Sequence, residues 1–453
     1  MNIGNSPRPD RSKTLRLYEE ARSIIPGATQ LFGKRQELFA PGQWPPYFAE
    51  ARGCRVTDLD GNEYLDMAQA GIGATVLGYA DPDVTAAVIA RIQKGTMCML
   101  SPPEEVELAK LMLQLHPWAR QVRLGRTGGE SMAMAVRIAR ASTGRDRVAF
   151  CGYHGWHDWY LAANLPQNEQ ADFQDQLGNW HLLPGLKPAG VPRGLAGTAL
   201  PFTYNKIDEL SNLVRRYGNE LAAIVMEPTR NFLPAAGFLE SVRELADQCG
   251  ARLIFDEVTI GWKLHLGGAH LKFGVHPDIA VFAKSTGNGH PISAVIGTDD
   301  TMQAVQDTFI SSALWTEAVG PAAGVATIGK MMRVDVPAHI DRIGARCRAG
   351  LTELAGQHGV PLIVAGHTAL LSFQFQHPQA AALQTLWTVR MLDRGFLAAA
   401  NFFPMLSHED QHVDQYLAAS GPVFAELRQA IDRDDITSRI GGPVKHTGFQ
   451  RLA

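Results

Sequence analysis

The sequence predicts an α/β fold with a mostly parallel central sheet. Three short apolar runs carry this prediction, at residues 253–258, 279–285 and 293–297. Each is rich in β-branched residues, as strands buried on both faces of a parallel sheet are. Residues 122–141 add a short strand, a turn of small residues and a strong helix in succession. Together these stretches predict buried strands with helices packed against them.

Two of the apolar runs carry a charged residue near their end, Asp256 in the first and Lys284 in the second. Ligands of open α/β sheets bind outside the carboxyl ends of the strands, so both side chains are expected to point into one site. A carboxylate facing a lysine across such a site is what pyridoxal phosphate (PLP) chemistry needs. Lysine forms a Schiff base with this cofactor, and the carboxylate keeps the pyridine nitrogen protonated. Taken singly, each is more often a solvated loop lysine or a capping Asp.

Length and composition narrow the possible classes. A chain of 453 residues is too long for one simple core, so two or three structural units are expected. Its 45% hydrophobic and 19% charged residues are those of an ordinary soluble protein. A net charge of -3 argues against nucleic acid or an anionic membrane as a partner. No apolar run approaches the roughly 20 residues that span a bilayer.

The cysteines and the first residues indicate a cytoplasmic protein. The five cysteines are odd in number, scattered and without a CxxC pair, which suits a reducing compartment better than a disulfide framework or a zinc knuckle. They are Cys54, Cys98, Cys151, Cys249 and Cys347. The start of the chain lacks the apolar core of a signal peptide.

The first 66 residues predict an N-terminal arm, a helix and a hairpin. Apolar residues at helical spacing indicate a helix over 12–25, which stops at Pro26 and Gly27. Residues 47–67 alternate like strands around the turn Asp60-Gly61-Asn62, a strong hairpin signal. Amphipathic helices are expected at 82–94 and 103–115.

The turn Thr127-Gly128-Gly129-Glu130 lies between a strand at 122–124 and a helix over 131–141. Free backbone N–H groups and the helix dipole converge at such a point, so the turn is a candidate anion site. Its spacing fits neither GxGxxG nor GxxxxGK[ST], which disfavours a dinucleotide fold and a P-loop. By itself the turn is more simply a helix N-cap with glycines for turn geometry.

Further strands and loops follow in order. A strand at 148–151 leads into a polar and aromatic cluster at 152–159, which could stack on an aromatic ring and matches no standard zinc motif. Residues 165–200 are rich in Pro and Gly and predict a long loop. A buried strand at 221–226 ends at Glu227, and a helix follows at 239–250. A change of pattern near 320 divides a large domain, 67–320, from a smaller α+β domain, 321–453.

With these motifs laid out, the chain resembles the class III aminotransferases, a fold-type I PLP family, and within it glutamate-1-semialdehyde 2,1-aminomutases. The resemblance runs from about residue 18 to 432. It implies the PLP transferase fold, a homodimer, and transfer of an amino group from a donor to a carbonyl acceptor by a ping-pong Schiff-base mechanism. It is carried by residues 25–27, 58–66, 127–130, 153–155, 227–228, 255–258 and 283–289.

The resemblance also implies residue roles. Lys284 is the Schiff-base lysine and later a proton carrier, and Asp256 pairs with the pyridine nitrogen. Val258 packs on one face of the ring and Tyr153 stacks on the other. The remaining candidates are Thr127, Gly128 and Gly129 for the phosphate, Thr316 from the partner subunit for the same phosphate, and Glu227 and His154 around the ring.

Departures from the family pattern bear on the reaction. The usual Ser-Gly-Thr turn reads Thr127-Gly128-Gly129, so one hydroxyl donor is missing, and the usual Gly-Asn-Pro after Thr316 reads Val-Gly-Pro at 319–321. The carboxylate-binding arginine of the aminomutases could be Lys34 or Arg35. Their loop glutamate has no counterpart at 399–403, which favours an aminotransferase, with an aminomutase or a PLP-dependent epimerase as the alternative.

Residues 408–412 form a rival motif, His-Glu-Asp-Gln-His, which fits the HExxH signature of zinc hydrolases. In that signature, two histidines on a helix bind the metal. The plainer interpretation is a polar helix start, with Ser407 as N-cap and Asp410 completing a box-like arrangement. No buried apolar frame surrounds the motif, so the zinc hydrolase is the remote alternative and no metal is expected.

Overall fold

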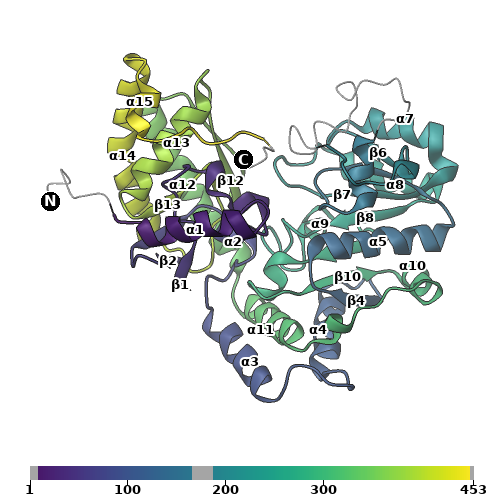
Figure 1. Ribbon diagram of the computed structural model, residues 1–453. Helices are drawn as coiled ribbons and strands as arrows, with labels where there is room; N and C mark the ends of the chain where they lie inside the picture. The colour runs from purple at the N-terminus through teal and green to yellow at the C-terminus, as the bar shows by residue number, and fades with distance from the viewer. Residues whose placement is uncertain (1–8, 166–186, 449–453) are drawn as a thin grey trace. The chain divides into compact units, whose positions relative to one another are not determined.

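Figure 1 shows the computed structural model of the chain, which describes residues 9–165 and 187–448. The described residues form two compact units. One combines Met1–Asp81 with Ala338–Ala453, and the other is Pro82–Pro337. The boundaries after residues 66 and 320 stay predictions. Within the described parts of the chain, no helix is both long and apolar enough to cross a membrane.

The unit Pro82–Pro337 is built on one sheet, whose described strands follow the order β4-β10-β9-β8-β7-β5-β6. Neighbouring strands from β9 to β6 are parallel, while β10 is antiparallel to both of its neighbours. The mostly parallel α/β sheet is therefore confirmed. The strands are β4 (Gln121–Gly125), β5 (Arg147–Cys151), β6 (Ala199–Pro201), β7 (Leu221–Met226), β8 (Arg252–Asp256), β9 (Ile279–Phe282) and β10 (Ser293–Gly297).

One sequence prediction about this sheet is wrong, because the run at 293–297 was assigned to parallel strands and β10 is antiparallel. A parallel connection needs a crossover of about a dozen residues or more, usually with a helix. The link between Phe282 and Ser293 is shorter and contains only a 3-10 turn, Lys284–Gly287. The chain therefore returns beside β9 in the opposite direction.

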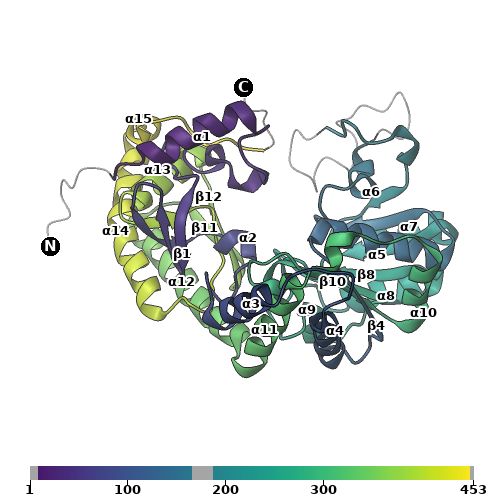
Figure 2. The ribbon, with the colours of Figure 1, turned by 60° about the horizontal axis from the view of Figure 1, so that its bottom comes forward.

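Helices cover both faces of this sheet. Val148 and Phe150 of β5 pack with α5 (Gly128–Thr143), whereas Ala149 and Cys151 pack with α7 (Ile207–Tyr217) and α8 (Phe238–Cys249). Successive side chains of a strand point to opposite faces, so one strand serves both layers. Figure 2 shows α11 (Val319–Arg333) beside α3 (Pro82–Gln93) and α4 (Pro103–Leu115). The short helices of this unit are α6 (Asp158–Leu161), α9 (Ala269–Phe273) and α10 (Asp299–Met302).

The helices and loops largely follow the sequence. Helices are confirmed at Ser12–Ile24 (α1), Pro82–Gln93, Pro103–Leu115 and Phe238–Cys249. The helix expected from residue 131 begins earlier, at Gly128, because Thr127 and Glu130 form a reciprocal capping box. Residues 166–186 of the predicted long loop lie outside the described residues. The rest of that loop contains a 3-10 turn, Arg193–Leu195, and the start of β6.

The other unit contains two small sheets, of order β1-β2-β3-β13 and β11-β12-β14 in its described residues. The predicted hairpin is confirmed, since β2 and β3 are antiparallel and the Asp58 carboxylate accepts the N–H groups of Asp60 and Asn62, each at 2.9 Å. The strands are β1 (Phe48–Arg52), β2 (Arg55–Asp58), β3 (Glu63–Met67), β11 (Leu362–His367), β12 (Leu370–Phe375), β13 (Phe396–Ala398) and β14 (Asn401–Phe402).

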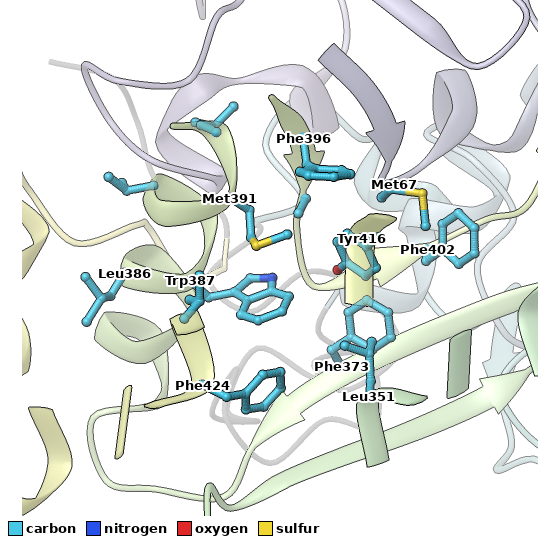
Figure 3. Close-up of a cluster of buried hydrophobic side chains, with 14 of the residues drawn as sticks. Met67, Leu351, Phe373, Leu386, Trp387, Met391, Phe396, Phe402, Tyr416 and Phe424 are labelled. Carbon is cyan, nitrogen blue, oxygen red and sulfur yellow. The ribbon is translucent and has the colours of Figure 1, made fainter. Parts of the chain in front are cut away.

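Aromatic side chains fill the core of this second unit (Figure 3). The ring of Trp387 lies edge-on to those of Tyr416 and Phe424, with centroids 6.1 and 5.1 Å apart. Such contacts add to the burial of large apolar surface and hold the two helices that carry these residues against each other. The helices are α2 (Ala70–Gly73), α13 (Ala380–Leu392), α14 (Asp410–Asp432) and α15 (Ile436–Ile440), with α12 (Val336–His358) crossing the unit boundary.

Candidate active site

Three chemically active side chains follow three adjacent strands. β7, β8 and β9 are parallel neighbours, with Met226 opposite Phe255 and Asp256 opposite Val281. Glu227 comes directly after β7, Asp256 ends β8, and Lys284 follows β9. Because the carboxyl ends of parallel strands share one edge of the sheet, these side chains lie at the same edge.

Asp256 is held by a backbone amide and by an imidazole. It is 3% exposed, and its Oδ1 accepts the N–H of Val258 at 2.9 Å. Its Oδ2 lies 2.8 Å from Nδ1 of His154, whose Nε2 lies 3.0 Å from the Cys151 carbonyl oxygen. A carbonyl only accepts, so Nε2 of His154 carries a proton. The contact at Nδ1 then needs one more proton, which the histidine and the carboxyl group share.

Lys284 combines backbone strain with an altered basicity. Its φ of 41° lies in the left-handed region that side chains rarely adopt. Such a conformation costs about 1–3 kcal/mol and persists where the surrounding structure imposes it, often at functional sites. The Lys284 Nζ donates to Oγ1 of Thr259 at 3.0 Å. Burial, and then the charge of Arg230, lower the pKa of Lys284 to about 8, against the opposing effect of Glu227 and Asp256.

A second lysine, Lys263, contacts the same threonine as Lys284. Lys263 is 2% exposed, and its Nζ donates to the Thr259 carbonyl oxygen at 2.7 Å and to Ser285 Oγ at 2.8 Å. Burial and the charge of Lys284 lower the pKa of Lys263 to about 7. Thr259 therefore accepts from both lysines, through its carbonyl and its hydroxyl. This residue and Lys263 were missed from the sequence, where nothing marks their approach to Lys284.

Glu227, Arg230 and Tyr153 form a charged and aromatic group at the same edge. Glu227 is 5% exposed, and burial raises the pKa of its carboxyl group, which the charge of Arg230 opposes. NH1 of Arg230 donates to Oε2 of Glu227 at 3.3 Å. The guanidinium carbon of Arg230 lies 5.8 Å from the centroid of the Tyr153 ring. Arg230 was also missed, although an arginine three positions after a strand-end acid is a visible signal.

The turn at Thr127–Glu130 opens the helix α5 with free donors. The first helical bond runs from Ser131 N–H to the Thr127 carbonyl oxygen, at 3.0 Å. Among the described residues, no hydrogen-bond partner is found for the N–H groups of Gly128 and Gly129. A Cβ at Gly128 would lie 2.7 Å from Val258 Cγ1. The turn therefore needs glycine there, and its two free N–H groups at a helix N-terminus can hold an anion.

His157 lies against the same turn. A Cβ at Gly129 would lie 3.1 Å from the His157 Nδ1, so this ring fills the space that a side chain at position 129 would take. That nitrogen is buried and has no hydrogen-bond partner in the described part of the chain. Burial lowers the pKa of His157, which favours the neutral ring. A buried unpaired nitrogen beside two free N–H groups fits a phosphate, so these residues suit PLP. His157 was in the predicted polar and aromatic cluster without a role.

Thr316 lies on the segment that packs on this turn. Trp315 Nε1 donates to Oε1 of Glu130 at 2.9 Å, and NH2 of Arg126 donates to the Glu317 carbonyl oxygen at 2.6 Å. The Thr316 side chain itself is exposed, with its hydroxyl donating to the Ala313 carbonyl oxygen at 2.9 Å. The structure thus anchors Trp315 to the turn and Glu317 to the residue before it, and leaves Thr316 at the surface.

The rival zinc motif does not form its helical geometry. α14 begins at Asp410, so His408 precedes the helix. Its Nδ1 accepts the N–H of Met405 at 2.9 Å, and its Nε2 donates to the Asp66 carbonyl oxygen at 2.8 Å. The expected cap was wrong, because Glu409 is the N-cap and pairs with His412. Ser407 and Asp410 do not take these positions, since the helix begins two residues later than a Ser407 cap requires.

The other sequence candidates lie in the other unit. Lys34 and Arg35 belong to a 3-10 turn and its end, and the guanidinium of Arg35 lies 5.0 Å from the centroid of the Phe32 ring. The segment 399–403, where an aminomutase carries an acid, joins β13 to β14. None of its residues is acidic.

Comparisons with known proteins all match this chain to aminotransferases and related enzymes. A family model described as Aminotransferase class-III matches residues 40–420. A glutamate-1-semialdehyde 2,1-aminomutase of Syntrophobacter fumaroxidans is 33% identical, over 92% of this chain and 99% of that protein. A 3-aminobutyryl-CoA aminotransferase of Cloacimonas acidaminovorans is 31% identical, over 83% of this chain and 87% of that protein. An omega-transaminase structure from Sphaerobacter thermophilus has a TM-score of 0.78 and 26% identity, covering 94% of this chain and 99% of that one.

Proposed function

The chain belongs to the class III aminotransferases and moves an amino group from a donor to a carbonyl acceptor with PLP, and we propose that Lys284 carries this reaction. The observation that carries the proposal is the lysine itself. It follows β9 with a strained backbone, lies at the sheet edge that also holds Asp256, and has a pKa lowered to about 8. A lysine whose pKa lies near neutral pH is in part uncharged there, so it can act as a nucleophile and as a proton acceptor.

The other site residues hold and tune the cofactor. Bound PLP supplies an aldehyde that condenses with amines and a ring that accepts electrons. Asp256, supported by His154, would keep a proton on the ring nitrogen. Val258 and Tyr153 would pack against the ring, and Glu227 would set the local charge. Thr127 and the N–H groups of Gly128 and Gly129 would bind the phosphate, and His157 would replace the hydroxyl that the turn lacks.

Chemical trapping tests the assignment of Lys284. Borohydride should remove the visible absorbance band of purified enzyme and fix the cofactor mass on the peptide that contains Lys284. Lys284→Ala should retain PLP through its phosphate contacts and lose turnover almost entirely. Cofactor fixed to a peptide with any other lysine, Lys263 included, contradicts the assignment.

A transaminase and an aminomutase differ in what one substrate alone does. The segment 399–403 has no acid, which supports release of the first product before the acceptor binds. Enzyme mixed with donor alone should lose its visible band and release one equivalent of keto product, as in a ping-pong reaction. Isomerisation of a single amino-carbonyl compound at full rate without a second substrate would establish the mutase instead.

We also propose a homodimer in which Thr316 completes the phosphate site of the partner. Large apolar side chains near this residue are 50–99% exposed, and Ala318 N–H bonds the Thr96 carbonyl oxygen at 2.9 Å, which joins their two segments. An exposed apolar surface of this kind marks an interface, here with a second copy. The side chains are Met97, Met99, Leu100, Phe309 and Leu314.

Mixed dimers test the position of Thr316. Subunits with Thr316→Val and subunits with Lys284→Ala are each expected to have little activity. In a mixed dimer, the subunit with Thr316→Val keeps its own Lys284 and receives an intact threonine from the other subunit. Activity should therefore return to one site in two. No recovery would place Thr316 in its own subunit's site, and a monomer in solution would end the dimer proposal.

The cytoplasmic location also remains a proposal. All five cysteines are free thiols, four of them at least partly buried, which supports a reducing compartment. Cell fractionation of the tagged protein tests it, and recovery outside the cytoplasm contradicts it.

A further inference from the structure

Arg230 presents a positive charge on the open side of a buried acid. It lies four positions past the end of β7, and its NH1 contacts Oε2 of Glu227 at 3.3 Å. The side chain of Arg230 is 36% exposed, whereas that of Glu227 is 6% exposed. One side of the guanidinium therefore contacts the acid, and another side remains open to solvent.

The donors of this guanidinium are mostly unused within the described chain. An arginine has five N–H donors, and the described contacts of Arg230 are the single bond to Glu227 and the approach to the Tyr153 ring. The planar fork of an arginine matches the two oxygens of a carboxylate, which it binds through parallel hydrogen bonds. The ring of Tyr153, whose centroid lies 5.8 Å from the guanidinium carbon, is itself 47% exposed.

We propose that Arg230 binds a carboxylate of the amino donor, so that the enzyme prefers anionic amino acids to amines without an acid group. This inference rests on the proposed function, because it requires the amino group of the donor to react at Lys284. Glu227, which follows the strand next to that of Asp256, fixes Arg230 at the sheet edge where Lys284 also lies. The structure thus places a carboxylate receptor at the edge where the amine reacts.

The charges of the site explain why an anion fits there. After burial, the charge of Arg230 is the main cause that lowers the pKa of Lys284, while Glu227 and Asp256 raise it. A carboxylate bound to Arg230 neutralises this cation and makes Lys284 more basic. The donor therefore strengthens the proton acceptor that its own conversion requires, which a donor without a carboxylate cannot do.

A simpler role for Arg230 is to neutralise Glu227 alone. The two roles predict different kinetics. A structural pairing would affect all donors alike, since its loss changes the site before any donor binds. A carboxylate receptor affects only donors that carry the acid group, and it does so mainly through KM.

Two matched pairs of donors separate these roles. Alanine and ethylamine differ by a carboxylate, as do 3-aminobutyrate and isopropylamine. Arg230→Gln in the PLP-loaded enzyme should raise KM for the two acids by about 10- to 100-fold, the effect of losing a charge-assisted contact. The KM of the two amines should change less than about threefold. Arg230→Lys should restore part of the loss, because it keeps the charge without the fork.

Two controls keep the result interpretable. Arg216→Gln removes an arginine that also lies over a tyrosine ring, at 5.0 Å from Tyr217, and should leave all four KM values unchanged. The double variant Glu227→Gln with Arg230→Gln avoids a buried unpaired acid if the single variant folds poorly. It should also have lost the preference for donors that carry a carboxylate.

The outcomes also separate this inference from the proposed function. Equal losses for acids and amines, or retained preference for acids in both Arg230→Gln variants, overturn the carboxylate receptor while transamination stands. A different result would contradict the proposed function, namely a wild-type enzyme that binds PLP but transfers no amino group from any donor.

Discussion

Two consecutive acids at the end of β8, Asp256 and Glu257, each contact a histidine, and only the pair of Asp256 with His154 belongs to the proposed active site. The distances are equal, because Asp256 Oδ2 to His154 Nδ1 and Glu257 Oε1 to His270 Nδ1 are both 2.8 Å. Both acids are buried, at 3% and 1% exposure. Burial and pairing therefore do not distinguish a catalytic acid from a structural one here.

The second nitrogen of each histidine makes the difference. Nε2 of His270 accepts the indole N–H of Trp118 at 3.1 Å, so His270 is neutral and donates only from Nδ1. Glu257 also accepts the N–H groups of Ala269 and His270 at the start of α9, at 3.0 and 2.8 Å. This pair has its donors and acceptors matched and fixes the helix.

His154 contacts a carbonyl oxygen instead, so its pair with Asp256 holds an additional proton. With this proton the pair of His154 and Asp256 is neutral overall, and a ligand that contacts Asp256 can change how the proton is shared. The group that contacts the second nitrogen of each histidine, a donor for His270 and an acceptor for His154, therefore distinguishes the two buried acids.

The strongest test replaces each acid by its amide. Asp256→Asn should lower kcat by about 10²–10³-fold while the protein remains folded, because the electrostatic partner of the ring nitrogen is lost. Glu257→Gln should lower the free energy of unfolding by roughly 1–3 kcal/mol, with kcat per folded molecule within a few-fold of wild type. Steady-state kinetics and thermal unfolding measure both. A large loss of kcat in Glu257→Gln with normal stability would break the comparison.

The histidines should differ in the same way, with smaller effects. His154→Asn should lower kcat by about 10- to 100-fold, the usual effect of removing a group that orients another, with little change in the melting temperature. His270→Asn should lower the melting temperature and leave kcat per folded molecule within a few-fold of wild type. Equal kcat values for wild type and His154→Asn would mean that Asp256 acts without this histidine.

His157 extends the comparison to an imidazole nitrogen without any partner in the described chain. If Nδ1 of His157 binds the cofactor phosphate, His157→Phe should weaken PLP binding by about tenfold, as the loss of one hydrogen bond to a charged group does. Equilibrium dialysis of PLP, with no turnover involved, measures it. Trp156→Phe is the control, because it keeps an aromatic ring at the exposed position whose side chain stacks on His157 with centroids 4.4 Å apart. Unchanged affinity in His157→Phe would mean that His157 does not contact the phosphate and that the backbone N–H groups of the turn bind it without this ring.

The sequence predicted what local patterns determine. Buried strands, their charged ends and the glycine turn follow from the hydrophobic period and turn chemistry, which act over a few residues. The direction of β10 was missed because it depends on the length of the link after β9. The start of α5 was missed because a capping box draws Gly128 and Gly129 into the helix.

Contacts between distant segments could not be predicted. His154 and Asp256 are 102 positions apart, and nothing in either segment states that they meet. The same holds for His157 over Gly129 and for Arg230 over Tyr153, where separate loops converge on one edge of the sheet. Glu257 and Asp256 are adjacent in sequence, yet only the tertiary neighbours of their histidines separate their roles.

The smallest effect on catalysis is expected at His408. Like His270, this histidine has a hydrogen-bond partner at each ring nitrogen, but it lies in the other unit. Its two nitrogens bond Met405 and Asp66, and burial lowers its pKa to about 4. The unfolded chain therefore binds a proton that the folded chain resists, so stability falls as the pH drops from about 6.5 towards 4. His408→Asn should flatten this part of the stability curve, whereas kcat at pH 8 stays within a few-fold and EDTA changes nothing. Activity lost on chelation and restored by zinc would instead make His408 a metal ligand.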